Sequence, residues 1–226
     1  MPFDAVLFDA GGVLVIPDPE VLGPIVARFG GSDDVEQLTR AHFAGSYAYD
    51  TVATGVDDWP TYLRAYAEAA GVPADRVDDA AAALGRTLDH EHWRTPFPGA
   101  VETLRALHER GVPIGIVSIA GGQIEQTMLD QAICQVGDGD HTPVRCVIDS
   151  FVVGVAKPDP AIFTHALDLL GLEASEAIAY VGDTVYNDVR GAEAAGLTPL
   201  LHDPFGFHAD GPHRRLARLE DLLDLV

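Results

Sequence analysis

Four segments of this 226-residue sequence place polar side chains directly after short apolar runs. Asp9 follows the first run, Ser118 ends the second, Lys157 comes after the third, and Asp183 and Asp188 follow the fourth. Such runs are typical of buried strands in a parallel sheet, whose ligands bind beyond the carboxyl ends of the strands. We therefore expect these side chains to converge on one edge of one sheet.

These residue types suit the chemistry of a phosphate ester. Asp9 and Asp183 offer the hard oxygen atoms that Mg²⁺ prefers. Ser118, with the backbone amides of the turn and helix start after it, can hold phosphoryl oxygens. Lys157 adds a positive charge, and it is the only lysine among fourteen basic residues, which favours a specific role. One carboxylate is then free to attack phosphorus and form an aspartyl-phosphate.

The elements that must position these residues alternate along the chain. Apolar runs predict strands over residues 5–8, 112–119, 144–148, 177–181 and 198–201. Helices are predicted over residues 100–110, 123–132, 160–170 and 188–195, with a final amphipathic helix over 216–226. Parallel strands require such crossovers. The expected fold class is α/β, with a Rossmann-like parallel sheet core and helices on both faces.

Residues 17–94 interrupt this alternation. The segment contains no convincing strand, and helices are predicted over residues 19–29, 33–44, 57–70 and 74–90. We expect residues 1–16 and 95–226 to form the catalytic core and residues 17–94 to form an inserted all-helical cap. The stretch 137–143 is rich in turn-forming residues, and we expect it at the surface.

In order and position, the four segments resemble the haloacid dehalogenase (HAD) superfamily, in the branch with a helical cap inserted after the first strand. The resemblance covers nearly the whole chain. The motifs that carry it are Phe8-Asp9-Ala-Gly-Gly-Val-Leu, Val117-Ser118, Lys157-Pro-Asp-Pro-Ala-Ile-Phe and Val181-Gly-Asp-Thr-Val-Tyr-Asn-Asp188.

The resemblance implies a role for each residue of the site. Asp9 would be the nucleophile, and Mg²⁺ would be held by Asp9, Asp183 and the backbone carbonyl of Gly11. Asp188 would support Lys157 or the metal shell. The residues implied to contact the phosphoryl group are Ser118, Lys157 and, through its backbone amide, Ile119.

Two positions depart from the family pattern. Phosphatases of the family usually carry a second Asp two residues after the nucleophile, which protonates the leaving group and then activates water; here that position is Gly11. General acid–base catalysis contributes ~10²–10⁴-fold in rate, so we expect slow hydrolysis of alkyl phosphates. Acyl, aryl or anomeric phosphates need less protonation. Ile119 stands where the family commonly has Asn, which affects substrate orientation more than phosphate binding.

The sequence therefore indicates a Mg²⁺-dependent phosphatase-like hydrolase of small organic phosphates, weakened or restricted in its leaving groups by Gly11. Two alternatives stay open. Gly11 is compatible with a metal-free 2-haloacid dehalogenase-like enzyme, although Asp183 would then face an anionic substrate. A catalytically silent protein that binds phosphate ligands could keep the same residues, and Asp9, Asp183 and Asp188 also belong to a residue type that caps helices.

Composition argues against several other classes. The net charge of −21 repels nucleic-acid backbones and anionic lipid surfaces, so the expected partner is a small phosphorylated molecule, not a nucleic acid or a membrane. The N-terminus lacks the pattern of a signal peptide, and no stretch approaches the ~20 apolar residues of a membrane span. Cys134 and Cys146 cannot form a disulfide framework. We expect a cytoplasmic protein.

The remaining aromatic and histidine residues are interpreted as structural. Several side chains of residues 17–94 could line a substrate pocket, but their helical spacing favours packing within the cap: Tyr47, Tyr49, Asp50, Trp59, Tyr62 and Trp93. Five histidines match no zinc-binding spacing, and we expect them to be scattered on the surface: His90, His92, His202, His208 and His213.

Overall fold

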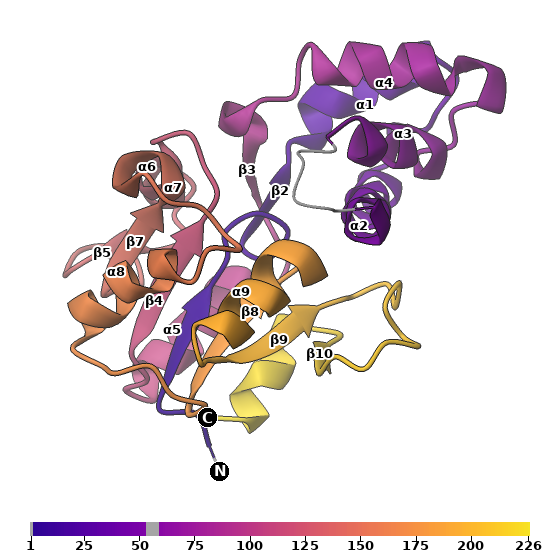
Figure 1. The fold of residues 1–226 in the computed structure, drawn as a ribbon. Helices are drawn as coiled ribbons and strands as arrows, with labels where there is room; N and C mark the ends of the chain where they lie inside the picture. Colours follow the sequence, from indigo (N-terminus) through magenta and orange to yellow (C-terminus); the bar gives the residue numbers. More distant parts are fainter. Residues whose placement is uncertain (1, 53–58) are drawn as a thin grey trace.

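The computed structural model describes residues 2–52 and 59–226, and its larger part is built on a six-stranded sheet (Figure 1). All neighbouring strands of this sheet are parallel, in the order β10-β9-β8-β1-β4-β7. β1 therefore lies in the interior, between β8 and β4. The strands are β1 Ala5–Phe8, β4 Ile114–Ser118, β7 Cys146–Asp149, β8 Ile178–Gly182, β9 Thr198–His202 and β10 Arg215–Leu216.

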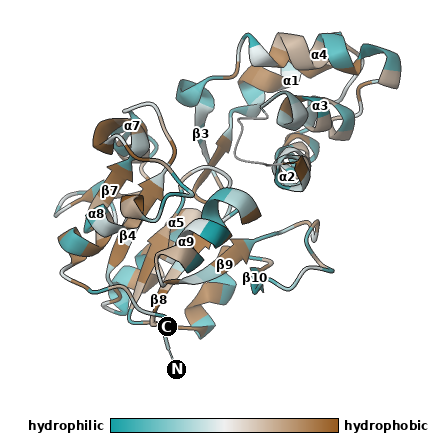
Figure 2. Ribbon diagram, in the orientation of Figure 1, coloured by the Kyte–Doolittle hydropathy of each residue, from teal (hydrophilic) through white to brown (hydrophobic). Residues whose placement is uncertain are grey.

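Side chains of β1 alternate between two apolar layers, because successive residues of a strand point to opposite faces. Val6 and Phe8 pack with α5, α6 and the 3-10 helix η4, whereas Ala5 and Leu7 pack with α8 and α9. Figure 2 shows the resulting apolar colouring of the central strands. The predicted α/β class is confirmed. The helices are α5 Ala100–Glu109, α6 Ile124–Asp130, α8 Ala161–Leu170, α9 Arg190–Ala194 and η4 Leu219–Asp224.

A second group of helices lies apart from the sheet and has its own apolar core, which includes Leu22, Tyr66 and Leu84 (Figure 1). α2 continues beyond the predicted end at residue 44. The start of the helix predicted from residue 57 lies outside the described residues. The elements are α1 Pro19–Arg28, α2 Val35–Val52, α3 Trp59–Ala69, η1 Ala74–Arg76, α4 Val77–Gly85 and η2 His90–His92.

A short antiparallel ribbon joins the two parts. It consists of β2, Val15–Pro17, and β3, Trp93–Pro96, with Ile16 opposite Thr95. The expectation that residues 17–94 hold no strand is therefore wrong at both ends, since Pro17 and Trp93 belong to this ribbon. Strands of three or four residues are too short to show a periodic pattern in the sequence. They are stabilised by pairing with a distant segment, which the local sequence does not reveal.

Four further segments differ from the sequence-based expectation or complete it. The first two residues of the predicted helix 188–195 belong to a π-helical turn, η3 Val185–Val189, which leads into α9. The predicted helix 216–226 is a strand and a 3-10 helix instead, because β10 pairs with the open edge of β9. The stretch 137–143 follows β5, Gln135–Val136, and leads into β6, Pro143–Val144; its residues 137–140 are exposed, as expected. The helix α7 spans Ser150–Val153.

Among the described residues, no helix has the length and hydropathy needed to cross a membrane.

Candidate active site

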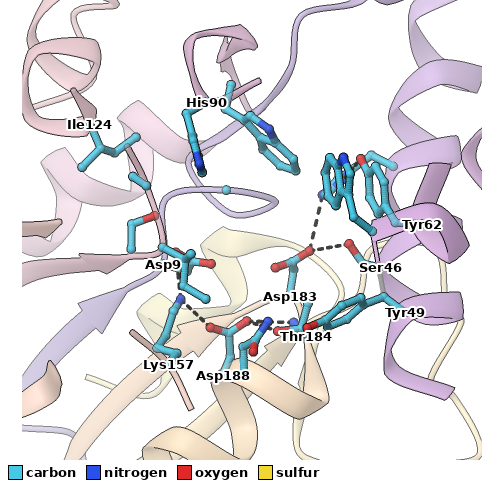
Figure 3. A pocket seen from close by; sticks show the side chains of 18 of the residues that line it. Asp9, Ser46, Tyr49, Tyr62, His90, Ile124, Lys157, Asp183, Thr184 and Asp188 are labelled. Carbon is cyan, nitrogen blue, oxygen red and sulfur yellow. Dashed lines mark hydrogen bonds and ion pairs between the residues drawn. The ribbon is translucent and has the colours of Figure 1, made fainter. Parts of the chain in front are cut away.

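The carboxyl ends of three neighbouring strands meet at one cavity of about 690 Å³ (Figure 3). Asp9 follows β1, Ser118 ends β4 and Asp183 follows β8, and the cavity is also lined by Lys157 and Asp188. The strand order explains the convergence, because β1 pairs with β4 on one side and with β8 on the other. The structure thus brings together all five side chains singled out in the sequence.

Lys157 is the positive centre of this group. Its buried ammonium lies 2.9 Å from Oδ1 of Asp9 and 2.6 Å from Oδ1 of Asp188. Burial by itself would lower the pKa of Lys157, but the two carboxylates outweigh it and raise the pKa above its ordinary value. The ammonium also donates to the Tyr180 hydroxyl at 2.7 Å, and that hydroxyl donates to the Val117 carbonyl at 3.1 Å. Lys157 is therefore charged and held in place.

Asp188 uses both of its carboxylate oxygens. Oδ1 pairs with Lys157, while Oδ2 accepts hydrogen bonds from the backbone amide and the hydroxyl of Thr184 at 2.9 and 2.6 Å. This arrangement is that of a residue that orients Lys157 and the turn after β8. Tyr180 has a similar supporting position but was missed by sequence reasoning, because within an apolar strand run it resembles any core aromatic.

Three carboxylates could hold a metal ion here. Oxygen atoms of Asp9, Asp183 and Asp188 lie within 4.8 Å of one another, and all three residues are buried. Burial raises the pKa of Asp9 to about 7, and the charges of Asp188 and Asp183 add to this rise against the opposing effect of Lys157. Three hard oxygen donors with one lysine between them carry excess negative charge, which fits a divalent cation such as Mg²⁺.

Asp183 is contacted from the helical part by α2. The Ser46 hydroxyl donates to Oδ2 of Asp183 at 2.8 Å, and Nε2 of His42 lies 3.4 Å from the same oxygen. Burial alone would raise the pKa of Asp183, but the neighbouring His42, Ser46 and Lys157 bring it below its ordinary value. Sequence reasoning missed His42 and Ser46. Their spacing of four residues on one helix face was the only available signal.

Two glycines bring the loop after β1 close to these groups. Gly12 has a φ of +70°, and a Cβ atom there would lie 2.4 Å from the Asp183 carboxylate, so this position accepts only glycine. A Cβ atom on Gly11 would lie 3.2 Å from two ring carbons of Trp93. The indole of Trp93 therefore lies where a side chain at position 11 would extend.

The turn after β4 is built differently from the expectation. Ser118 is buried, and the Ile119 side chain is 41% exposed; both residues line the cavity. The backbone amide of Gly122, in the turn, and that of Ile124, the first residue of α6, donate to Oδ2 of Asp149 at 2.8 and 3.4 Å. These two amides are bound to a protein carboxylate, which corrects the expectation for them alone; that Ser118 and the Ile119 amide hold phosphoryl oxygens stays a prediction.

Several residues interpreted as structural also reach the cavity. Its wall includes Tyr49, Trp59, Tyr62, Trp93 and His90. Tyr62 is part of the helical core as well, so packing and pocket lining coincide there. His202 is 1% exposed, which corrects its expected surface position, and its Nδ1 lies 2.8 Å from the Gly12 carbonyl.

Comparisons with known proteins agree with this geometry. A family model described as haloacid dehalogenase-like hydrolase matches residues 3–196. The chain is 31% identical over 213 residues to phosphoglycolate phosphatase of Rhodospirillum rubrum, covering 90% of this chain and 80% of that protein. It is 36% identical over 105 residues to glyceraldehyde 3-phosphate phosphatase of Methanopyrus kandleri, covering 46% of this chain but only 42% of that protein.

A solved structure of similar fold is that of 2-haloacid dehalogenase from Pseudomonas syringae pv. tomato DC3000. It is 20% identical, covers 99% of this chain and 97% of that chain, and has a TM-score of 0.56. At this identity the likeness concerns the fold alone. On the match of the family model over most of the chain and on relatives named as phosphatases, the chain belongs to the haloacid dehalogenase-like hydrolase family and is a phosphatase-like hydrolase.

Proposed function

We propose that this chain is a Mg²⁺-dependent phosphatase that hydrolyses small organic phosphates through an aspartyl-phosphate on Asp9. The observation that carries the proposal is the convergence of Asp9, Lys157, Asp183 and Asp188 on one cavity. The phosphatase names of the relatives support the same reaction class.

In the proposed reaction, a carboxylate oxygen of Asp9 attacks phosphorus. A new oxygen–phosphorus bond forms, and the bond to the leaving-group oxygen breaks and gives that oxygen its electron pair. Lys157, held by Asp188 and Tyr180, offsets the negative charge of the phosphoryl oxygens. Ser118 and the backbone amide of Ile119 hold the phosphoryl group from the β4 side. Water then attacks the aspartyl-phosphate, which releases inorganic phosphate and restores Asp9.

Asp9, Asp183 and the Gly11 carbonyl would hold Mg²⁺, with Asp188 supporting the site. When bound, the ion would supply Lewis-acid stabilisation of charge on the phosphoryl oxygens. Ser46 and His42 hold one oxygen of Asp183 in a fixed direction, so α2 takes part in orienting this metal ligand.

Gly11 restricts the leaving groups in this proposal. Without a carboxyl group at position 11, the departing oxygen receives no proton from that side, and alkyl phosphates should react more slowly by ~10²–10⁴-fold. Acyl and aryl phosphates are the expected better substrates. We further propose that residues 17–94 act as a cap over residues 1–16 and 95–226, and that the enzyme works in the cytoplasm on a small phosphorylated molecule.

The test is phosphate release from acetyl phosphate and p-nitrophenyl phosphate with Mg²⁺, and again after addition of EDTA. Asp9→Asn should lower the rate on the order of 10³-fold or more, and acid-quenched wild type should carry phosphate on the peptide that contains Asp9. Asp89→Asn is the matched control, since Asp89 lines the same cavity outside the carboxylate group. A wild type no faster than Asp9→Asn across both substrates would refute the proposal.

A metal-free dehalogenase is the competing function that Gly11 allows. A 2-haloacid brings a carboxylate, and the described residues that line the cavity include no arginine and no lysine other than Lys157. The three aspartates would repel such a substrate. Halide release from 2-chloropropionate in EDTA would favour the dehalogenase. Binding of phosphate with no turnover of any phosphate ester would favour a silent binding protein.

A further inference from the structure

The part of the cavity contributed by the helical part and the ribbon is aromatic. The rings of Trp59 and Tyr62 stack with centroids 4.4 Å apart at an interplanar angle of 4°, and the Trp93 ring lies 6.4 Å from that of Tyr62. All three side chains line the same cavity as Asp9. Figure 3 shows Tyr62 across the cavity from Asp9. We call these three residues the aromatic wall. Trp59 and Trp93 are only half-buried and both line the cavity, so part of each ring is accessible to a ligand.

Among the described residues, no lysine or arginine side chain lines the cavity beside the aromatic wall. Lys157 is the only lysine or arginine among the described cavity-lining residues, and it is paired with Asp9 and Asp188 at the opposite side. Asp89 adds a further carboxyl group to the lining. A second anionic group on a substrate would therefore find no lysine or arginine side chain there, and the histidines His42 and His90 would be its nearest basic groups.

The chemistry at position 11 favours a leaving group that is stable as an anion. Gly11 supplies no acid, and Trp93 occupies the adjacent space. A leaving group must then depart as an anion that is stable by itself. A phenol has a pKa of about 10, like the tyrosine side chain, compared with about 15.7 for water, and simple alcohols resemble water. A phenol is thus more acidic than a simple alcohol by several powers of ten, and its oxygen is the better leaving group.

From these observations we propose that the substrate is a phosphate monoester of an uncharged, flat aromatic or heteroaromatic alcohol, whose ring lies against Trp59 and Trp93. The proposal rests on the hydrolase function above and names its substrate class. Asp9 attacks phosphorus, the bond from phosphorus to the aryl oxygen breaks, and the aryl oxide leaves with the electron pair and takes its proton from water.

Binding can be measured by tryptophan fluorescence, because the only two tryptophans of the chain, Trp59 and Trp93, both line this cavity. Non-hydrolysable ligands avoid turnover. Tryptophan fluorescence is titrated with three non-hydrolysable phosphonates in the presence of Mg²⁺. Phenylphosphonate should bind about tenfold more tightly than methylphosphonate, in line with the strength of aromatic contacts. The 4-carboxyphenyl analogue should bind more weakly than phenylphosphonate. Equal affinities for the phenyl and methyl compounds, or tighter binding of the carboxylated one, would overturn the proposal.

Variants locate the ring and separate this proposal from the function on which it rests. Trp59→Leu should weaken phenylphosphonate about five- to tenfold relative to methylphosphonate, and Trp59→Phe should restore most of the preference. Tyr47→Leu is the matched control, because Tyr47 lies on α2 outside the cavity lining, and it should leave the preference unchanged. An unchanged preference in Trp59→Leu would exclude the aromatic wall as the ring site.

Steady-state kinetics complete the separation. Phenyl phosphate should show a lower KM than acetyl phosphate, and glycerol phosphate should show the lowest kcat. If acetyl phosphate is hydrolysed but phenyl phosphate has no KM advantage, the substrate class is wrong and the phosphatase function stands. If neither is hydrolysed while phenylphosphonate still binds preferentially, the phosphatase function fails and the ring site stands.

Discussion

The indole of Trp93 limits which side chain position 11 can carry. A Cβ atom at Gly11 would meet the Trp93 ring at 3.2 Å, a distance at which one neighbour must shift. We therefore expect Gly11→Asp alone to gain little activity on glycerol phosphate. Combined with Trp93→Ala, the new carboxyl group has room to act as general acid, and kcat should rise on the order of 10²-fold.

The control for this pair is Trp93→Ala by itself, and acetyl phosphate is the reference substrate because it needs no acid. The thermal midpoint of each variant shows whether it is folded. An equal gain in Gly11→Asp with and without Trp93→Ala would mean that Trp93 does not limit this position.

The sequence was sufficient to predict the site residues whose neighbours are fixed by the order of the strands. Asp9, Ser118 and Asp183 meet because three buried strands pair in parallel, and each strand end carries a polar residue. Ser46 could not be found in this way, since its partner Asp183 is 137 positions away in sequence. Tyr180 was missed for a related reason, because only the structure shows that its hydroxyl contacts Lys157.

At the scale of elements, α2 contacts the turn after β8 along one face. His42, Ser46 and Asp50 are spaced four residues apart, and the Asp50 carboxylate accepts the backbone amides of Val185 and Tyr186 at 2.7 and 2.8 Å. Asp50 thus connects the helical part to the π-helical turn that follows Asp183. Burial raises the pKa of Asp50 to about 7, against the effect of these hydrogen bonds.

We expect Asp50→Asn to loosen this contact, because an amide side chain presents one acceptor and one donor to two backbone donors. Hydrogen exchange at the amides of Val185 and Tyr186 should become faster by about fivefold, for a net loss near 1 kcal/mol. Asp34→Asn is the control, since Asp34 accepts the amide of Gln37 at the other end of α2. Unchanged exchange at Val185 and Tyr186 would show that Asp50 does not hold the turn.

The end of β9 contacts the loop after β1 through His202. The pKa of His202 is lowered to about 4, chiefly by burial and to a smaller extent by His42. The Gly12 carbonyl, Asp183 and Asp203 act in the opposite direction but do not outweigh burial. In the unfolded chain the pKa is near 6.5. Between these values the unfolded state binds the proton and the folded state does not, so stability is full above pH 6.5 and is lost as the pH falls toward 4.

Urea denaturation tests this difference. From about pH 7.5 to about pH 4.5, His202 should account for a loss of about 2–3 kcal/mol in the free energy of unfolding. His202→Asn keeps a donor for the Gly12 carbonyl but does not titrate, so its loss over the same range should be smaller by that amount. His108→Asn, at an exposed histidine of α5, should behave as wild type. Identical pH dependence in His202→Asn and wild type would contradict the assignment.

Elements with a continuous local pattern of apolar, proline and glycine residues were predictable, and elements defined only by pairing with a distant segment were not. The helix predicted over residues 160–170 and the strand over 5–8 match α8 and β1 closely, because their boundaries are set by local proline, glycine and apolar residues. β10 is two residues long and exists only because β9 offers an open edge. The ribbon of β2 and β3 depends in the same way on a partner that local sequence does not reveal.

For the whole molecule, charge is the dominant property. The net charge of −21 creates a repulsive field for any phosphate, and three of the aspartates are buried together around one lysine. Screening by salt should weaken the general repulsion, but the buried group is little screened. A divalent ion at Asp9, Asp183 and Asp188 would compensate it directly. Stability in Mg²⁺ therefore measures the metal site without any substrate.

A ligand that binds only the folded chain stabilises it by about 2.7 kcal/mol when present at a hundred times its dissociation constant. For a chain of this size, this corresponds to a rise of roughly 5–10 °C in the thermal midpoint. We expect that rise in MgCl₂ relative to NaCl of equal ionic strength, and its reversal by EDTA. Asp183→Asn should abolish the increment, whereas Asp89→Asn, in the same cavity, should retain it.

A Mg²⁺ increment of the same size in Asp183→Asn would place the ion elsewhere. No increment in wild type at millimolar Mg²⁺ would mean that the carboxylate group does not bind the ion at that concentration.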